Sequence, residues 1–202
     1  MREGLWTTKD ERNQYLNIIE DEATRLSYLM NDLFDLAKID DGRITLHLED
    51  IELDQLIEQV SSKTSYRALE KGITLTAEHS ALEGVTIWGD PLRMEQVLLN
   101  IVENAIRYTP HGRITISVLC EAENVKIKVE DTGIGINKEE LPYIFDRFYR
   151  VEKSRSRAYG GTGLGLSIVK QLIELHQGSI HVDSTIGQGT TVTITLPQSS
   201  EK

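Results

Sequence analysis

The stretch GGTGLGLSIVK, residues 160–170, is rich in glycine and leads directly into an apolar helical pattern. Glycine lets a backbone approach a ligand closely, and the first turn of a helix offers unpaired N–H groups to an anion, so this stretch is a candidate phosphate loop. Neither common phosphate motif fits it, because Leu166 stands where a dinucleotide fingerprint starting at Gly161 needs glycine and where a P-loop needs lysine. Two interpretations remain: a different kind of nucleotide loop, or a flexible turn before a helix.

The composition is that of an ordinary globular protein. The 202 residues are 39% hydrophobic, which is enough for one core and an appended element. A net charge of −10 argues against nucleic-acid binding, which depends on basic contacts to phosphate. The single cysteine, Cys120, excludes an internal disulfide and a multi-cysteine zinc site, and we expect it in the core. Because the sequence contains no apolar run of about 18 residues and no apolar signal core, we expect a cytoplasmic protein.

The N-terminal region carries a heptad pattern. Its apolar residues recur at alternating steps of three and four, at Leu16, Ile19, Ala23, Leu26, Met30, Leu33 and Ala37. This pattern predicts a long helix that ends near Gly42 and packs against another helix. A single helix cannot bury such a seam, so we expect a homodimer or a partner helix outside this sequence.

After residue 42 the pattern changes to short alternating strands and amphipathic helices. Strand patterns occupy 44–48, 73–79, 85–90, 113–120, 124–131, 179–183 and 190–196. Helical patterns occupy 54–72, 91–108 and 163–176. We predict an α+β two-layer sandwich, with a mixed or antiparallel sheet covered by helices on one face. The predicted division of the chain is 1–42 for the heptad region and 43–202 for the sandwich.

A polar stripe runs along the predicted helix 91–108. It consists of residues spaced four apart: Gln96, Asn100, Asn104 and Tyr108. Asparagine is unfavourable inside a helix because its side chain competes for backbone hydrogen bonds. The two amides therefore suggest oxygen ligands for a hard cation such as Mg²⁺, with a solvated helix face as the alternative.

The predicted strand 124–131 ends on a carboxylate. Asp131 has the same parity as the apolar residues of this strand, so it points toward their buried face. The chain then turns through Gly133 and Gly135. A buried acceptor beside a closely approaching backbone could bind the exocyclic amine of a flat base, and an Asx turn is the alternative.

Segment 150–162, RVEKSRSRAYGGT, has neither a helical nor a strand period. It is basic and ends on glycine, which is typical of a mobile lid over a polyphosphate, or of a solvated loop. Positive charge gathers in and just before it, at Arg147, Arg150, Lys153, Arg155 and Arg157.

Four motifs in this order carry a resemblance to a known family: NIVENAIRYT (100–109), DTGIGI (131–136), IFDRFYR (144–150) and GGTGLGLSIVK. Together they resemble the nucleotide-binding domain of sensor histidine kinases. That domain belongs to the ATPase superfamily shared with gyrase, the large heat-shock chaperones and mismatch-repair ATPases. The resemblance covers roughly residues 50–197. It makes the glycine-rich stretch the family's second glycine box, which forms the hinge of the lid and the helix end that faces the ATP phosphates.

The resemblance implies a site for Mg-ATP or ADP. It makes Asn104 the principal Mg²⁺ ligand, supported by Asn100 one turn earlier. Arg107, where the family more often has lysine, would reach phosphate, and Tyr108 would lie by the adenine. Asp131 would accept from the adenine amine.

Glycines and cations complete this implied site. Gly133 and Gly135 would shape the adenine pocket, and Arg150 would bind the terminal phosphates, with Lys153 as a second cation. The residues that would close the phosphate side are Gly161, Thr162, Gly163, Leu164 and Gly165.

The heptad region, YLNIIEDEATRLSYLMNDLFDLAKID (15–40), resembles the second helix of the dimerisation and phosphoacceptor hairpin of these kinases. The first helix should carry a phosphoacceptor histidine in a context like H-E-L-R-T-P. None of the five histidines has this context: His47, His79, His111, His176 and His181. The acceptor is therefore expected outside this chain.

The resemblance implies the kinase of a bacterial two-component system. Such a kinase transfers the γ-phosphoryl group of ATP to a histidine for relay to an aspartate of a response regulator. One alternative is a binding module that holds ATP without turnover. A serine kinase of the anti-sigma type would share the ATP motifs but would not need the heptad helix. A gyrase-type ATPase would have a glutamate base where Asn100 stands, and an amide cannot act as that base.

Overall fold

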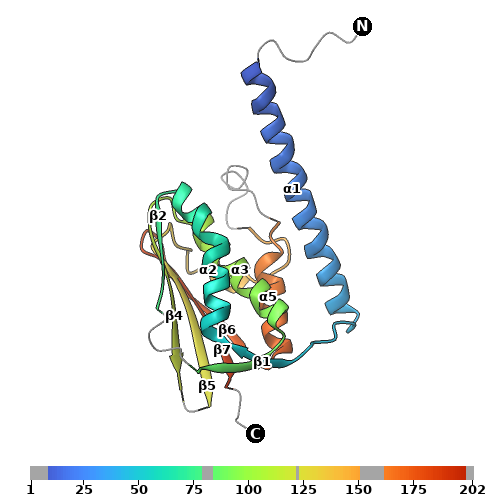
Figure 1. The fold of residues 1–202 in the computed structure, drawn as a ribbon, viewed down its shortest axis with the longest axis vertical. Helices are drawn as coiled ribbons and strands as arrows, with labels where there is room; N and C mark the ends of the chain where they lie inside the picture. Colours follow the sequence, from blue (N-terminus) through green and yellow to red (C-terminus); the bar gives the residue numbers. More distant parts are fainter. Residues whose placement is uncertain (1–8, 79–83, 122, 151–161, 199–202) are drawn as a thin grey trace.

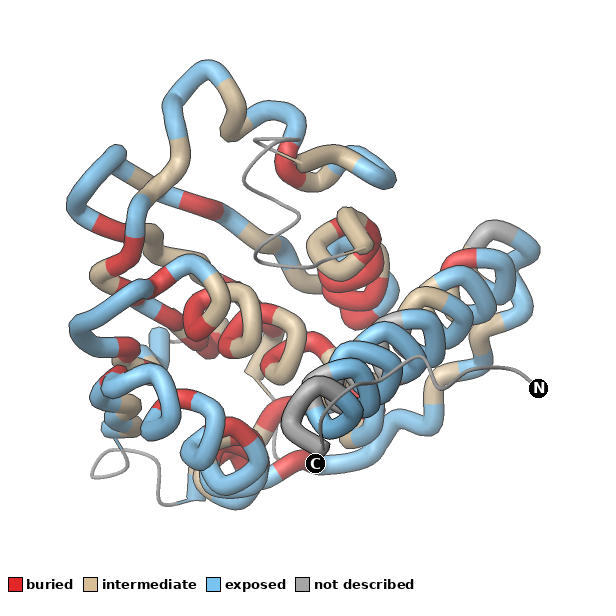
Figure 2. The backbone as a smooth tube through the Cα atoms, turned by 90° about the horizontal axis from the view of Figure 1, so that it is seen from above, coloured by how far each residue is buried: buried red, intermediate tan, exposed pale blue. Residues whose placement is uncertain are grey.

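A long helix leads into the rest of the structure, a computed structural model that describes residues 9–78, 84–121, 123–150 and 162–198. This helix, α1 (Lys9–Asp40), projects well beyond the other elements (Figure 1). It ends at Asp40, near Gly42 as predicted: Gly42 has φ +63° and its N–H donates to the carbonyl of Ile39 at 2.9 Å. Most of α1 is exposed (Figure 2), and its heptad packing stays a prediction.

The main sheet has five strands in the order β2-β4-β5-β7-β6. These are β2 (Ile73–Ala77), β4 (Gly112–Cys120), β5 (Asn124–Asp131), β7 (Gly189–Pro197) and β6 (Ser179–Thr185). The β2–β4 pair is parallel and the other pairs are antiparallel, so the sheet is mixed, which is one of the two predicted alternatives. The hairpins β4–β5 and β6–β7 lie where strand alternation predicted them.

Helices cover one face of this sheet (Figure 1), namely α2 (Leu53–Glu70), α3 (Pro91–Tyr108) and α5 (Gly165–Leu175). Alternate residues of β5 point toward them, and Ile127 at its centre is fully buried with Leu98 of α3 and Ile168 of α5. A 3-10 turn, η1 (Leu141–Tyr143), follows β5. The predicted arrangement, with helices covering one face of a sheet, is confirmed.

Helix α3 begins where its sequence provides a cap. The carboxylate of Asp90 accepts from the N–H of Arg93 at 3.1 Å, and Pro91 occupies the first turn, where a missing N–H is tolerated. The same carboxylate accepts from the N–H of His47 at 2.9 Å. Asp90 therefore ties the segment that follows α1 to the start of α3.

Two expectations from the sequence are wrong. Residues 44–48 do not form a strand; β1 (Glu49–Glu52) follows them instead and pairs with β3 (Thr86–Gly89), because the backbone at His47 bonds to the Asp90 carboxylate. Cys120 is exposed. On β4 burial decreases from Ile114 and Ile116 to Cys120, which is the last residue of the strand, next to the connection to β5.

Candidate functional site

A buried carboxylate lies at the end of β5. Asp131 is only 8% exposed, and its Oδ1 accepts from the backbone N–H groups of Gly133 at 2.8 Å and Thr190 at 3.3 Å. Burial raises the pKa of Asp131, and the two N–H bonds oppose that rise. Both bonds end on one oxygen. Among the described residues no group donates to Oδ2, so this oxygen can accept from a ligand.

The glycine turn after Asp131 is pressed against the end of α3. A side-chain carbon on Gly133 would lie 2.4 Å from the carbonyl oxygen of Tyr108 and 2.8 Å from Asp131 Oδ1. The N–H of Ile134 donates to the same Tyr108 carbonyl at 3.1 Å. The structure thus brings together Tyr108, Asp131 and Gly133, which the sequence assigned to one pocket.

The hairpin turn between β6 and β7 closes another side of this region. Gly135 has φ +69°, and a side-chain carbon there would lie 2.1 Å from the carbonyl oxygen of Thr185. The N–H of Gly187 donates to the carbonyl of Ile134 at 2.8 Å. Sequence analysis assigned no role to this turn, and it missed Thr190, whose backbone N–H donates to Asp131.

A second buried polar group lies beside Asp131 and was also missed. Thr109 is fully buried, and its hydroxyl has no hydrogen-bond partner among the described residues. It lies 2.9 Å from the position of a side-chain carbon on Gly133. A buried hydroxyl without a partner fits a site that receives a ligand or water, because such groups are otherwise satisfied.

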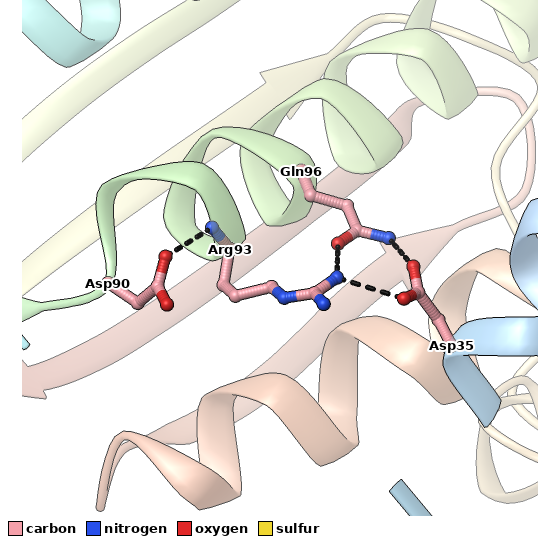
Figure 3. A network of polar contacts seen from close by, with 4 residues as sticks. All are labelled: Asp35, Asp90, Arg93 and Gln96. Atoms are coloured by element: carbon pink, nitrogen blue, oxygen red, sulfur yellow. Dashed lines mark hydrogen bonds and ion pairs between the residues drawn. The ribbon is translucent and has the colours of Figure 1, made fainter. Parts of the chain in front are cut away.

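The residues of the polar stripe on α3 lie in two different surroundings. Asn100 and Asn104 are half-buried, and the Asn100 side-chain oxygen lies 3.6 Å from the position of a side-chain carbon on Gly165, at the start of α5. Gln96 instead donates from Nε2 to Asp35 of α1 at 2.7 Å (Figure 3). Farther along α3, Arg107 is half-exposed.

The backbone of Phe148 packs closely against Gly163 of the second glycine box. Gly163 has φ +74°, and a side-chain carbon there would lie 2.9 Å from the backbone of Phe148. The Phe148 N–H donates to the Gly163 carbonyl at 2.9 Å, and the N–H of Leu164 donates to the Thr162 hydroxyl at 3.1 Å. Gly165 then opens α5, whose N-terminus suits an anion.

The cations predicted for the phosphates lie partly outside the described residues. Arg150 is half-exposed at the end of a described range. Just before it, the hydroxyl of Tyr149 donates to Glu140 at 2.7 Å, which raises the pKa of Tyr149 to about 12. Lys153 and Gly161 fall in the range 151–161, outside the described residues, as does most of the predicted lid.

In the part of the chain that is described, no helix has both the length and the apolar character needed to cross a membrane.

Comparison with known proteins supports the resemblance found in the sequence. Residues 89–200, just over half of the chain, match the family described as histidine kinase-, DNA gyrase B- and HSP90-like ATPases. The chain is 36% identical over 205 residues to the sensor histidine kinase WalK of Bacillus subtilis. It is 36% identical over 191 residues to the circadian input-output histidine kinase CikA of Synechococcus elongatus.

These alignments cover most of this chain and a minor part of each relative. They span 100% of the chain and 33% of WalK, and 94% of the chain and 25% of CikA. Among solved structures, full-length ShkA in complex with AMPPNP has a TM-score of 0.81 at 30% identity, over 95% of this chain and 40% of ShkA. The chain therefore belongs to the family of histidine kinase-, DNA gyrase B- and HSP90-like ATPases, and it carries the ATPase catalytic domain of histidine kinases.

Proposed function

We propose that the chain binds Mg-ATP along α3 and transfers the γ-phosphoryl group to a histidine of a separate acceptor helix. The observation that carries this proposal is the position of two unlike subsites on one helix. The buried Asp131 and the Gly133 turn contact the Tyr108 end of α3, whereas Asn100 faces the start of α5. Eight residues of helix separate these points, which is about 12 Å and matches the span from adenine to the phosphates of ATP.

At the adenine end, the free oxygen of Asp131 accepts from the exocyclic amine. Gly133 and Gly135 keep the backbone close enough to exclude side chains from the plane of the base, and Tyr108, 40% exposed, lies at its edge. The unpaired hydroxyl of Thr109 supplies a further polar contact, directly or through water. This set favours adenine because the buried acceptor requires a donor at the 6-position of the base.

At the phosphate end, amide oxygens fit a hard cation. Asn104 and Asn100 would hold Mg²⁺ together with phosphate oxygens, and the cation supplies charge neutralisation there. The backbone N–H groups at the start of α5, beginning near Leu164 and Gly165, would bind phosphate oxygens.

Basic side chains and the second glycine box complete the phosphate end. Arg107 and Arg150 would reach the phosphates, with Lys153 as a further cation. Gly161, Thr162 and Gly163 would close this side of the site. The chemistry of the site is then positioning and charge neutralisation.

The acceptor histidine is proposed to lie outside this chain. Three described histidines are exposed, at His47, His111 and His181. His176 is buried, accepting from the N–H of Asp90 at Nε2 and bonding the Leu172 carbonyl at Nδ1. Each thus belongs to the surface or the scaffold of the nucleotide domain.

Residues 1–42 are proposed to form the second helix of a dimerisation hairpin, and 43–202 the ATP-binding domain. Large apolar residues of α1 support this role because they are about half exposed, including Leu16, Ile19, Leu26, Met30 and Leu33. A second copy of the hairpin would bury them in a homodimer. The relay to a response regulator, and a place for this chain in the cytoplasmic portion of a larger sensor, are parts of the same proposal.

Calorimetry with Mg-ATP, Mg-ADP and Mg-GTP tests the nucleotide site first. We expect binding of the two adenine nucleotides and weaker binding of GTP. The chain is then mixed with ATP and a separate acceptor hairpin, and acid-labile phosphate is expected on the hairpin histidine. A folded chain that binds no nucleotide at millimolar concentration would refute the proposal, and rapid ATP hydrolysis without transfer would favour a gyrase-type ATPase.

A further inference from the structure

Three basic side chains of α2 reach across to α3, which lies beside it (Figure 1). Lys63, Arg67 and Lys71 are spaced four apart, so they lie on one face of the helix. Lys63 pairs with Glu95, and Arg67 Nη1 lies 2.7 Å from Glu103 Oε1. These partners follow one another along α3 in the same order, so the two helices run in the same direction. We call the three side chains the basic row of α2.

The last member of the basic row binds the backbone at the end of α3. Lys71 Nζ donates to the carbonyl of Ile106 at 2.8 Å and to the carbonyl of Arg107 at 3.1 Å. A helix leaves its last four carbonyls without partners inside the helix, and Lys71 satisfies two of the four in α3. Lys71 is also the C-cap residue of α2, so it joins the ends of the two helices.

Arg107 lies in the last turn of α3 and could pair within its own helix in two ways. Glu103 stands four residues earlier, a spacing at which a glutamate and an arginine attract each other. The carbonyls at the helix end are the second choice, because basic side chains near a helix C-terminus commonly bind them. The basic row occupies both: Arg67 pairs with Glu103, and Lys71 binds two of the carbonyls.

Repulsion between cations also keeps Arg107 away from the helix end. Burial lowers the pKa of Lys71, and the nearby positive charges of Arg107 and Arg67 lower it further. The repulsion is mutual, so turning toward Lys71 costs Arg107 free energy. Among the described residues, the guanidinium of Arg107 has no hydrogen bond or ion pair, and the residue is half-exposed. Its charge is therefore available to an anion.

We propose that Arg67 and Lys71 are positioning residues for phosphate binding, which act by keeping Arg107 from pairing within its own helix. This rests on the proposed function, in which Arg107 reaches the phosphates of ATP. The apparent affinity for a ligand falls with the fraction of protein in which the binding group is not available. By taking both competing partners, the basic row keeps that fraction small before ATP arrives.

Releasing Glu103 tests the first half of this inference. Arg67→Met should weaken Mg-ATP binding in calorimetry about two- to fivefold, the range that exposed ion pairs of this kind give. Adding Glu103→Gln removes the competing carboxylate and restores the wild-type net charge, so the double variant should regain the wild-type affinity. Adenosine, which lacks phosphates, should bind all of these forms equally.

Releasing the helix-end carbonyls tests the second half. Lys71→Met should weaken Mg-ATP binding by a similar factor, whereas Lys71→Arg, which can still bind the carbonyls, should not. In an Arg107→Gln background, Lys71→Met should have no further effect, because the side chain that it positions is gone.

Lys63→Met is the matched control, because it removes the same kind of bridge between α2 and α3 eight residues away from Lys71. It should leave the affinity for Mg-ATP unchanged. Denaturant titration of every variant measures the free energy of unfolding separately, so that a loss of stability is not mistaken for a loss of affinity.

The outcomes separate this inference from the proposed function. Failure of the folded chain to bind any nucleotide would overturn both. Affinity for ATP that falls in Arg107→Gln but stays unchanged in Arg67→Met or in Lys71→Met would overturn the inference alone. Unchanged affinity in Arg107→Gln would overturn it and would also remove Arg107 from the phosphate end. A loss that persists without Arg107, or that Glu103→Gln does not restore, would show a general effect of charge or helix stability and would overturn it as well.

Discussion

Replacing Asp131 with asparagine changes one oxygen of the adenine subsite and almost nothing else. Asp131 Oδ1 accepts from the N–H groups of Gly133 and Thr190, so the amide oxygen of the substituted side chain is expected to keep that position. The amide nitrogen then replaces Oδ2, the oxygen proposed to face the adenine amine. The amide N–H of the variant would then face the N–H of the adenine amine, at a residue that is only 8% exposed.

The size of the effect follows from that burial. Leaving a buried donor without its partner costs about 1–3 kcal/mol, which corresponds to a loss of about 5- to 150-fold in ATP affinity. Stability should change in the opposite sense. Because burial raises the folded-state pKa of Asp131, the ionised carboxylate lowers the free energy of unfolding once the pH rises above that pKa. The neutral amide removes this penalty, so Asp131→Asn should be at least as stable as the wild type at neutral pH.

Calorimetry with Mg-ATP and Mg-GTP on both proteins gives the comparison. GTP carries an acceptor oxygen at the 6-position, so the variant should lose ATP affinity but not GTP affinity. Glu130→Gln is the matched control, because it makes the same charge change on the neighbouring exposed residue. Equal losses for ATP and GTP, or an equal loss in Glu130→Gln, would refute the adenine role and leave Asp131 as a cap of the turn.

Three further results are expected. Gly133→Ala places a carbon 2.4 Å from a carbonyl oxygen, so it should lower the free energy of unfolding by about 1–3 kcal/mol and weaken ATP binding in calorimetry; Gly84→Ala, at φ +78° in open space, should affect only stability. Asp90→Ala should lower the free energy of unfolding by about 1–2 kcal/mol in denaturant titrations at neutral pH. Burial alone would raise the pKa of Asp90, but the N–H bonds from His47 and Arg93 hold it below the usual range, so this advantage should disappear as the pH falls through that lowered pKa; an advantage independent of pH would contradict the assignment. The chain incubated with ATP alone should show no acid-labile phosphate by mass spectrometry, and label on any of its own histidines would contradict an external acceptor: His47, His79, His111, His176 or His181.

Local sequence determined the elements and the identity of the domain. The parity of Asp131 placed it on the buried face of β5, and Gly42 marked the end of α1. These signals depend on neighbours within a few residues, such as alternation, capping and positive φ. The order of four motifs, each short and local, was sufficient to predict the ATPase family of histidine kinases, which the family match shows.

Contacts between distant segments were decided by the tertiary structure alone. The pairing register of β5 and β7 brings the Thr190 backbone to Asp131. Gln96 binds Asp35 of α1 and not the predicted cation site, because α1 packs beside this part of α3. The Thr162 hydroxyl donates to Asp32, although 130 positions separate the two residues in the sequence. A helical or strand period shows which face of an element is apolar or polar, but what lies against that face depends on how elements far apart in the chain pack together.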